Sequence, residues 1–285
     1  MGNETKASRI TAASLSRTAD GAPAIRIHDT VYVAVGNGPI QIRYAPVTDM
    51  AIETITKDDL VGLHGIVDDL DAFIAEMNDL DLHFSQQSEL GRIWRPSDKK
   101  TPWGRSDGYI DYGDGVERHT TPSHGGFWVP KRLNKSIPDS YRRSNGWYEE
   151  DCEWAKVAVS LPHLFTDRER RTADRILRDW FPDEYEQVNG VILEEGQSRT
   201  KDERILRARH ANDWIVISAI RSQEHEGMVE CIATVGGKRS SWSSTSNPEE
   251  RTFLVPVEEY KPGLIGFVID PDRHREIGEA PRFGM

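Results

Sequence analysis

The alternation of apolar and polar residues in the first part of the chain predicts β-structure. Apolar, mostly β-branched side chains recur at about every second position between Ala24 and Tyr44, as in strands that bury one face. The sequence Gly36-Asn37-Gly38-Pro39 interrupts this run and is typical of a turn. We therefore predict two strands joined by a turn, preceded by a flexible polar tail at residues 1–22.

The next segment has the apolar spacing of an amphipathic helix, from about Asp58 to Leu82. The residues on its apolar face are separated by three or four positions and are Leu60, Leu63, Val67, Leu70, Ile74 and Met77. Gly62 and Gly65 each weaken a helix by about 1 kcal/mol relative to Ala. With the two strands before it, this helix predicts an N-terminal ββα module at residues 23–90.

The remaining pattern predicts a connector, two helices and four strands. Residues 91–115 are rich in Pro, Gly, Asp and Lys and show little periodicity. A helix is predicted at residues 149–161. Another begins at Thr166-Asp167-Arg168-Glu169, a capping box in which the threonine and glutamate side chains bond the backbone of the first turn. Strands are predicted at residues 214–220, 228–235, 251–257 and 264–269.

These elements predict an α+β fold with a mixed or antiparallel sheet and a few packed helices, because they do not follow a regular βαβ alternation. The predicted divisions are a flexible tail (1–22), an acidic ββα module (23–90), a connector (91–115), an α+β core (116–237) and a C-terminal β extension (238–285).

The composition predicts a cytoplasmic protein. No apolar run approaches the roughly 20 residues that span a bilayer, and residues 1–20 lack the apolar stretch of a secretory signal. The two cysteines, Cys152 and Cys231, give no disulfide framework.

Negative charge is concentrated in one segment. The chain has a net charge of −11, and between Thr48 and Leu90 eleven acidic residues face a single base, Lys57, which gives that segment a charge of −10. A solvated helix face has the same composition. Alternatively, an acidic face can bind a basic groove on another protein, because charge complementarity accelerates association and selects partners. The candidate binding residues are Asp68, Asp69, Glu76 and Asp79.

A second candidate site surrounds His124. It precedes Gly125-Gly126, whose backbone amides can face an anion. With Glu149 or Asp151 as its partner, His124 could serve as the acid/base of a hydrolase or transferase. The structural alternative is a turn that needs glycine, together with acidic residues that the helix dipole favours in a first turn.

No metal or cofactor is predicted, and direct nucleic-acid binding is not expected. His119 and His124 lack the spacing and the cysteine pair of a zinc site, and no phosphate-binding glycine loop occurs. The stretch Gly236–Trp242 joins Lys238 and Arg239 to an aromatic residue and could contact phosphate and a base. A solvated loop has the same composition, and the net negative charge of the chain opposes binding to nucleic acid.

Three sequence strings carry a resemblance to a known family. They are TPWGR at residues 101–105, TPSHGGF at 121–127 and GWYEEDCEW at 146–154. With further strings as far as Gly236-Gly237, they resemble an uncharacterised bacterial domain-of-unknown-function family found on plasmids, phages and other mobile elements, over roughly residues 100–237. The resemblance implies no activity or residue role. It implies the company of mobile-element proteins, which often serve transfer, maintenance or evasion of host defence.

Together these observations predict a cytosolic interaction protein of a bacterial mobile element. In this interpretation it inhibits or modulates a host nucleic-acid-handling or defence protein, to whose basic surface it presents acidic residues. The alternative is a hydrolase or transferase that uses His124 with Glu149 or Asp151. The oligomeric state stays open.

Overall fold

The fold is described from a computed structural model that places residues 9–47, 49–239 and 248–279. Helices and antiparallel sheets occur in separate groups along the chain, so the predicted α+β class is confirmed. The chain divides into two compact units, Met1–Ile176 and Leu177–Met285.

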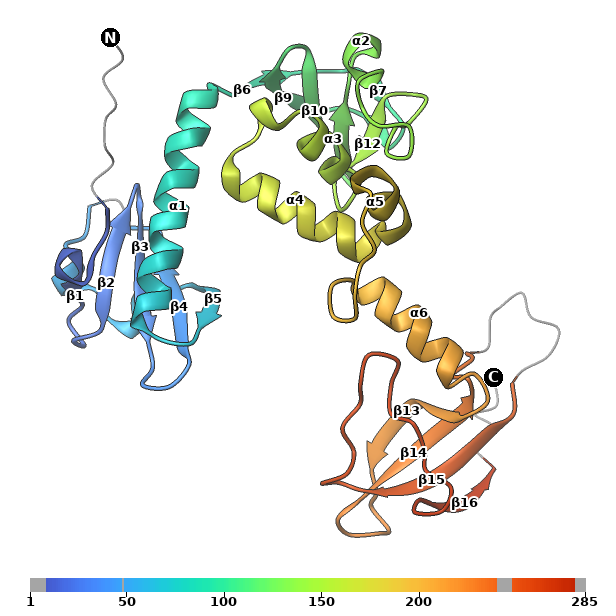
Figure 1. Cartoon of the computed structure of the whole chain (residues 1–285). Helices are drawn as coiled ribbons and strands as arrows, with labels where there is room; N and C mark the ends of the chain where they lie inside the picture. Colours follow the sequence, from blue (N-terminus) through green and yellow to red (C-terminus); the bar gives the residue numbers. More distant parts are fainter. Residues whose placement is uncertain (1–8, 48, 240–247, 280–285) are drawn as a thin grey trace. The chain divides into compact units, whose positions relative to one another are not determined.

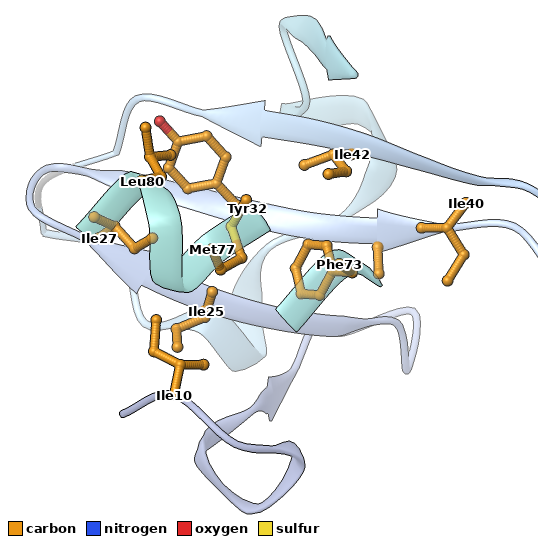
Figure 2. Packing of buried hydrophobic residues seen from close by; sticks show 10 residues of the cluster. Ile10, Ile25, Ile27, Tyr32, Ile40, Ile42, Phe73, Met77 and Leu80 are labelled. Carbon is orange, nitrogen blue, oxygen red and sulfur yellow. The ribbon is translucent and has the colours of Figure 1, made fainter. Parts of the chain in front are cut away.

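The first unit opens with a five-stranded antiparallel sheet in sequence order (Figure 1). Its strands are β1 (Ser16–Arg17), β2 (Pro23–Ile27), β3 (Thr30–Val35), β4 (Ile40–Ala45) and β5 (Gly62–Val67). Helix α1 (Leu70–Leu90) covers one face of this sheet. Figure 2 shows Phe73, Met77 and Leu80 of α1 pointing at the strand residues Tyr32 and Ile42, and all five are buried.

The opposite face of this sheet is covered by the segment between β4 and β5. That segment contains the 3-10 helices Ile52–Thr54 and Lys57–Asp59. Ile55 is fully buried there against Val31 and Val33 of β3. The sheet is therefore a layer with apolar packing on both sides, which is why its central strands are apolar on both faces.

The structure corrects the predicted tail and the first predicted strand. The first eight residues lie outside the described part of the chain, but Ile10 is buried in the core beneath α1, and its amide donates to the Asn78 side chain at 2.9 Å. The first predicted strand is a hairpin, β2 and β3, turned at His28, whose φ is +51°. The apolar alternation continues across this short turn and therefore conceals it.

Helix α1 begins at Leu70 rather than near Asp58, because the residues before it form strand β5. Strand β5 pairs antiparallel with β4. A Cβ at Gly62 would lie 2.5 Å from the Tyr44 ring, so the glycine that weakens a helix permits this close strand pairing. The helix ends at Gly91, which has the left-handed φ of +58° that glycine adopts readily.

A second antiparallel sheet follows in the first unit, with strand order β12-β11-β10-β9-β6. Its strands are β6 (Ile93–Pro96), β9 (Gly108–Gly113), β10 (Val116–Thr120), β11 (Gly125–Trp128) and β12 (Trp147–Glu149), and a separate hairpin joins β7 (Lys100–Thr101) to β8 (Gly104–Arg105). Residues 91–115, predicted as a connector, are instead part of this structure. Their Gly and Pro residues mark tight turns between short strands.

Helices lie between and after these strands. They are α2 (Lys131–Asn134), α3 (Trp154–Ser160), a 3-10 helix (Pro162–Leu164) and α4 (Asp167–Trp180). The predicted capping box at the start of α4 is confirmed. The Thr166 amide donates to the Glu169 carboxylate at 2.8 Å, and the Glu169 amide donates to the Thr166 hydroxyl at 3.2 Å.

The second unit contains two helices and a four-stranded antiparallel sheet. They are α5 (Pro182–Asn189), α6 (Arg199–Arg209), β13 (Trp214–Arg221), β14 (Met228–Val235), β15 (Glu250–Pro256) and β16 (Arg275–Glu279). The strands predicted at residues 214–220 and 228–235 are confirmed, and they pair as the antiparallel hairpin of β13 and β14. The strand predicted at residues 264–269 is instead an irregular segment that makes one isolated bridge, Ile215 with Val268. Because β14 pairs with β15, residues 214–279 share one sheet, and no domain boundary falls at residue 237.

Candidate functional site

The acidic residues predicted as one binding face do not share one environment. Asp69 is the N-cap of α1, where its carboxylate accepts a hydrogen bond from the Ala72 amide at 2.8 Å. Asp68 is exposed just before the helix. Glu76 and Asp79 lie further along α1 and are partly buried. Because α1 begins only at Leu70, Asp68 and Asp69 lie just before the helix, whereas Glu76 and Asp79 lie within it.

Glu76 and Asp79 are neutralised within the chain. The guanidinium of Arg168 on α4 donates to Glu76 and to Asp79, each at 2.8 Å. Glu76 is also bonded to His64 at 2.8 Å, and Asp79 is also paired with Arg171. These two acids are therefore not the uncompensated charges that the sequence predicts, because their basic partners lie about 90 positions further along the chain.

More polar contacts join α1 to the start of α4. Gln86 exchanges two hydrogen bonds with Asp167, both at 2.8 Å, and His83 is hydrogen-bonded to the Thr166 hydroxyl at 2.8 Å. We call this set of residues the α1–α4 interface: Glu76, Asp79, His83 and Gln86 with Thr166, Asp167, Arg168 and Arg171. It fixes the acidic face of α1 against the second half of the first unit.

The charges of the α1–α4 interface shift the pKa values of its members. Burial raises the pKa of Glu76, but the hydrogen bonds from Arg168 and His64 outweigh it, so that the pKa of Glu76 is lowered. Burial lowers the pKa of Arg168, but the carboxylates of Glu76 and Asp79 outweigh it, so that the pKa of Arg168 is raised. Both groups are therefore charged at neutral pH, and the contact is a true ion pair.

The outer strand β5 and Val61, the residue just before it, expose apolar side chains. Val61, Leu63 and Ile66 are 66%, 53% and 62% exposed. Leu63 is in register with Arg43 and Val33, so these three side chains share the sheet face away from α1. The segment that covers this face packs on β2 and β3. We call Val61, Leu63 and Ile66 the β5 edge.

His124 lies in an exposed turn between β10 and β11. The Thr121 amide and hydroxyl donate to the His124 carbonyl at 2.9 and 2.6 Å, and the His124 amide donates to the Thr121 hydroxyl at 3.2 Å. The imidazole itself makes no hydrogen bond or ion pair among the described residues, and His124 is not among the residues that line the pocket beside Glu150. The turn is held by backbone and threonine contacts.

Glu149 and Asp151 belong to the turn that starts α3. Glu149 ends β12, and its carboxylate accepts hydrogen bonds from the amides of Asp151 at 2.8 Å and Cys152 at 3.2 Å. Asp151 is exposed in this turn. Helix α3 begins only at Trp154, later than predicted, because the Glu149 side chain closes a turn first.

Gly125 and Gly126 serve side-chain packing in the middle of the second sheet. Both are buried in β11. A Cβ at Gly126 would lie 2.2 Å from the Trp103 ring and 2.4 Å from the Tyr148 carbonyl oxygen. A Cβ at Gly125 would lie 2.5 Å from the carboxylate of Glu150. The glycine pair therefore makes room for one aromatic ring and one acidic side chain.

That acidic side chain, Glu150, lines a pocket of the first unit. The pocket has a volume of about 310 Å³. Its aromatic walls are Tyr112, Phe127, Trp154 and Phe165, and its polar lining includes His83, Arg118, Glu150, Arg168 and Glu169. The aromatic rings contact one another, with centroids 4.9 Å apart for Tyr112 and Phe127 and 5.3 Å apart for Tyr112 and Phe165.

One charged pair in this pocket is too far apart for a direct hydrogen bond. Arg118 Nη2 and Glu150 Oε2 are 3.6 Å apart, which is longer than a hydrogen bond. By contrast, Glu169 accepts two hydrogen bonds from Arg92 at 2.7 Å. Burial lowers the pKa of His83, so that side chain is neutral at neutral pH.

The comparisons with known proteins bear on this part of the chain. Residues 96–211 match the family described as domain of unknown function (DUF7007). No curated protein and no solved structure matches the chain. The predicted resemblance to a domain of unknown function is confirmed for these residues, and the match ends before strand β13 rather than near Gly237.

The DUF7007 match contains almost the whole pocket. Every lining residue except His83 lies within residues 96–211. The β5 edge and the acidic residues of α1 lie outside the match. Within the first unit, the N-terminal sheet is therefore distinct from the matched residues 96–176, and the α1–α4 interface joins the two parts.

The matched region also contains a buried polar network that was not predicted from the sequence. His119 is fully buried, with Nδ1 bonded to the Ser106 hydroxyl and Nε2 bonded to the Glu117 carboxylate, both at 2.9 Å. Lys99 also donates to Glu117 at 2.8 Å and lies 3.8 Å from the centre of the Trp128 ring. The signal available in the sequence was the alternation that places Glu117 and His119 on one face of a strand.

The two basic residues predicted to contact phosphate make hydrogen bonds within the second unit. Arg239 donates to the Ile217 carbonyl at 2.8 Å, and the Lys238 carbonyl accepts from Thr234, whereas Trp242 lies outside the described residues.

Within the described ranges, no three His, Cys, Asp or Glu side chains gather to hold a metal ion. No helix in those ranges is long and apolar enough to cross a bilayer.

Proposed function

We propose that this chain is a cytosolic interaction protein of a bacterial mobile element, which binds an extended, basic segment of a host protein at the β5 edge. In this proposal the partner is a nucleic-acid-handling or defence protein, since such proteins present basic surface, and binding inhibits or modulates it. The exposed apolar residues of an outer strand are the observation that carries the proposal.

An outer strand offers unpaired backbone groups that can accept another strand. Natural proteins commonly block such strands with Lys or Pro. Strand β6, one of the two outer strands of the second sheet, contains Arg95 and Pro96, whereas β5 contains neither Pro nor a Lys or Arg residue. Strand β5 is therefore less protected than β6.

Two exposed acidic residues flank β5 in the sequence. Asp58 precedes the strand and Asp68 follows it, and both are exposed. A partner strand with apolar residues in its middle and Lys or Arg at its ends would match this arrangement. Complementary charge of this kind raises the association rate and selects the partner.

The alternative of a hydrolase or transferase has less support. It requires His124 to meet Glu149 or Asp151 in a pocket, but the imidazole is exposed in a turn and the Glu149 carboxylate is bonded to backbone amides. We therefore base the proposal on the N-terminal module.

A photo-crosslinking amino acid at Ile66 tests the proposal in a bacterial host lysate. The matched control carries the same group at Ile93, an apolar residue of β6 that is 55% exposed. We expect the Ile66 position to cross-link a defined peptide that is apolar in its middle and basic at its ends. The double substitution L63K/I66K and the charge reversal D58K/D68K should each abolish this product.

The outcome against the proposal is equally specific. If Ile66 and Ile93 yield the same background of cross-linked peptides, or if the product survives both L63K/I66K and D58K/D68K, the β5 edge is not a docking site. All altered residues are exposed, so the variants should fold, and an unchanged thermal melting curve provides the check.

A further inference from the structure

In the pocket of the DUF7007 region, Arg118 and Glu150 form an ion pair without a direct hydrogen bond, and Arg118 also lies beside the Tyr112 hydroxyl. The 3.6 Å gap between Arg118 Nη2 and Glu150 Oε2 is too long for a direct hydrogen bond. A donor and an acceptor held side by side at such spacing can each bond one of two neighbouring atoms on the edge of a planar molecule. Gly125 keeps the Glu150 carboxylate in place, because any side chain there would displace it.

The other charged groups in the pocket are already satisfied. Arg168 bonds Glu76 and Asp79, and Glu169 bonds Arg92. The charged lining residues are two Arg and two Glu, which gives no net charge. A phosphate or another strong anion therefore gains little here, and a neutral ligand with hydrogen-bonding groups fits better.

The walls suit a flat, largely apolar ring. Tyr112, Phe127, Trp154 and Phe165 supply aromatic surface, and such surfaces bind planar rings by stacking or edge contact. The volume of about 310 Å³ is at the lower end of the range for small-molecule sites, about 300–1,000 Å³. One base-sized heterocycle is the ligand size that this space admits.

From these features we infer that the pocket binds a neutral planar nitrogen heterocycle that presents a carbonyl oxygen beside an N–H group, as the guanine base does. Arg118 donates to the carbonyl oxygen, Glu150 accepts from the N–H, and the aromatic side chains hold the ring. Adenine can also present a ring nitrogen acceptor beside an N–H group when the ring is turned over, so it does not discriminate. A purine ring that lacks the carbonyl and the N–H offers only ring nitrogen acceptors and would leave the Glu150 carboxylate unsatisfied.

Isothermal titration of the full chain with guanosine, inosine and purine riboside tests this inference. Inosine keeps the carbonyl and the N–H, so it should bind like guanosine. Purine riboside has no N–H on its base and should bind at least about tenfold more weakly, because an unsatisfied polar group costs about 1–3 kcal/mol. R118Q and E150Q should each weaken guanosine binding by about tenfold or more. The matched control is R105Q, which alters an Arg whose side chain is 76% exposed and paired with Asp98 outside the pocket, and it should bind like the wild type.

Two results would overturn the inference. One is equal binding of guanosine and purine riboside, and the other is no binding of guanosine or inosine by the wild-type chain at millimolar concentration. Arg118 and Glu150 are part exposed, so both variants should fold. If a lowered melting temperature shows that one does not, the ratio of guanosine to purine riboside affinity on the wild-type chain decides. The β5 edge plays no part in this experiment, so its outcome is independent of the proposed function.

Discussion

The substitution R168M tests whether the acidic face of α1 serves the fold. Arg168 donates hydrogen bonds at 2.8 Å to Glu76 and to Asp79, and the three side chains are each 28% exposed. Methionine keeps much of the length and apolar stem of the side chain and removes the charge. The change therefore isolates the two ion pairs from packing.

The expected loss of stability is about 2 kcal/mol. A hydrogen bond to a charged group contributes about 1.5–3 kcal/mol, and two are removed. Partial exposure screens both pairs. Glu76 keeps His64 and Asp79 keeps Arg171, so neither carboxylate loses every partner. For a unit of this size, a loss of about 2 kcal/mol lowers the melting temperature by about 4–8 °C.

Urea unfolding followed by tryptophan fluorescence gives the free energy of unfolding. R105M serves as the matched control, since the Arg105–Asp98 pair is exposed, and it should cost less than about 0.5 kcal/mol. A double-mutant cycle of R168M with E76Q should show a coupling of about 1 kcal/mol, because the two side chains share a bond.

The pH dependence provides an independent check. The folded pKa of Glu76 is lowered, so its contribution to stability is fully present above the pKa of the unfolded chain and is lost as the pH falls through the folded pKa. R168M should reduce this loss at acid pH. If R168M costs no more than R105M, or if the cycle with E76Q is additive, the acidic face of α1 is not held by α4 and the reasoning fails.

Three further results are expected. G126A should destabilise the chain by about 3 kcal/mol or more in urea unfolding, because its Cβ meets the Tyr148 carbonyl oxygen, which cannot move freely. Burial lowers the pKa of His83 and His119, so protonation favours the unfolded chain. The free energy of unfolding should fall as the pH drops below about 6.5, and H119Q should lessen that fall. Burial raises the pKa of Cys231 to about 12, so a thiol reagent at pH 8 should modify this cysteine only after urea unfolds the chain.

Local signals in the sequence predicted local structure well. The capping box at Thr166 and Glu169 fixed the start of α4 because both partners of its hydrogen bonds lie within four residues. The hairpin of β13 and β14 was equally predictable from two apolar runs and a short loop. The start of α1 was not, because Leu63 and Val67 fit a helical spacing while their backbone pairs with β4. At these residues, pairing with β4 determines the backbone conformation, and the helical spacing of the apolar side chains does not.

The pocket could not be predicted, because its parts are scattered along the sequence. Tyr112, Arg118 and Phe127 come from three different strands, and Glu150 and Phe165 follow in turns. The Gly125-Gly126 motif does lie beside this pocket, but its glycines are needed for packing and not for the anion contact that the sequence suggests. The glycines are required by neighbouring side chains, and a single sequence does not reveal which neighbours those are.

The excess of acid between residues 48 and 90 has three separate physical uses. Asp69 caps a helix, which is a local backbone contact. Glu76 and Asp79 bind α4, so their charge is cancelled within the chain. Asp58 and Asp68 remain exposed at the two ends of β5. This last pair leaves charge for a partner beside exposed apolar side chains. Net charge alone therefore overstates the acidic surface available for binding, and the position of each carboxylate decides which of them a partner can meet.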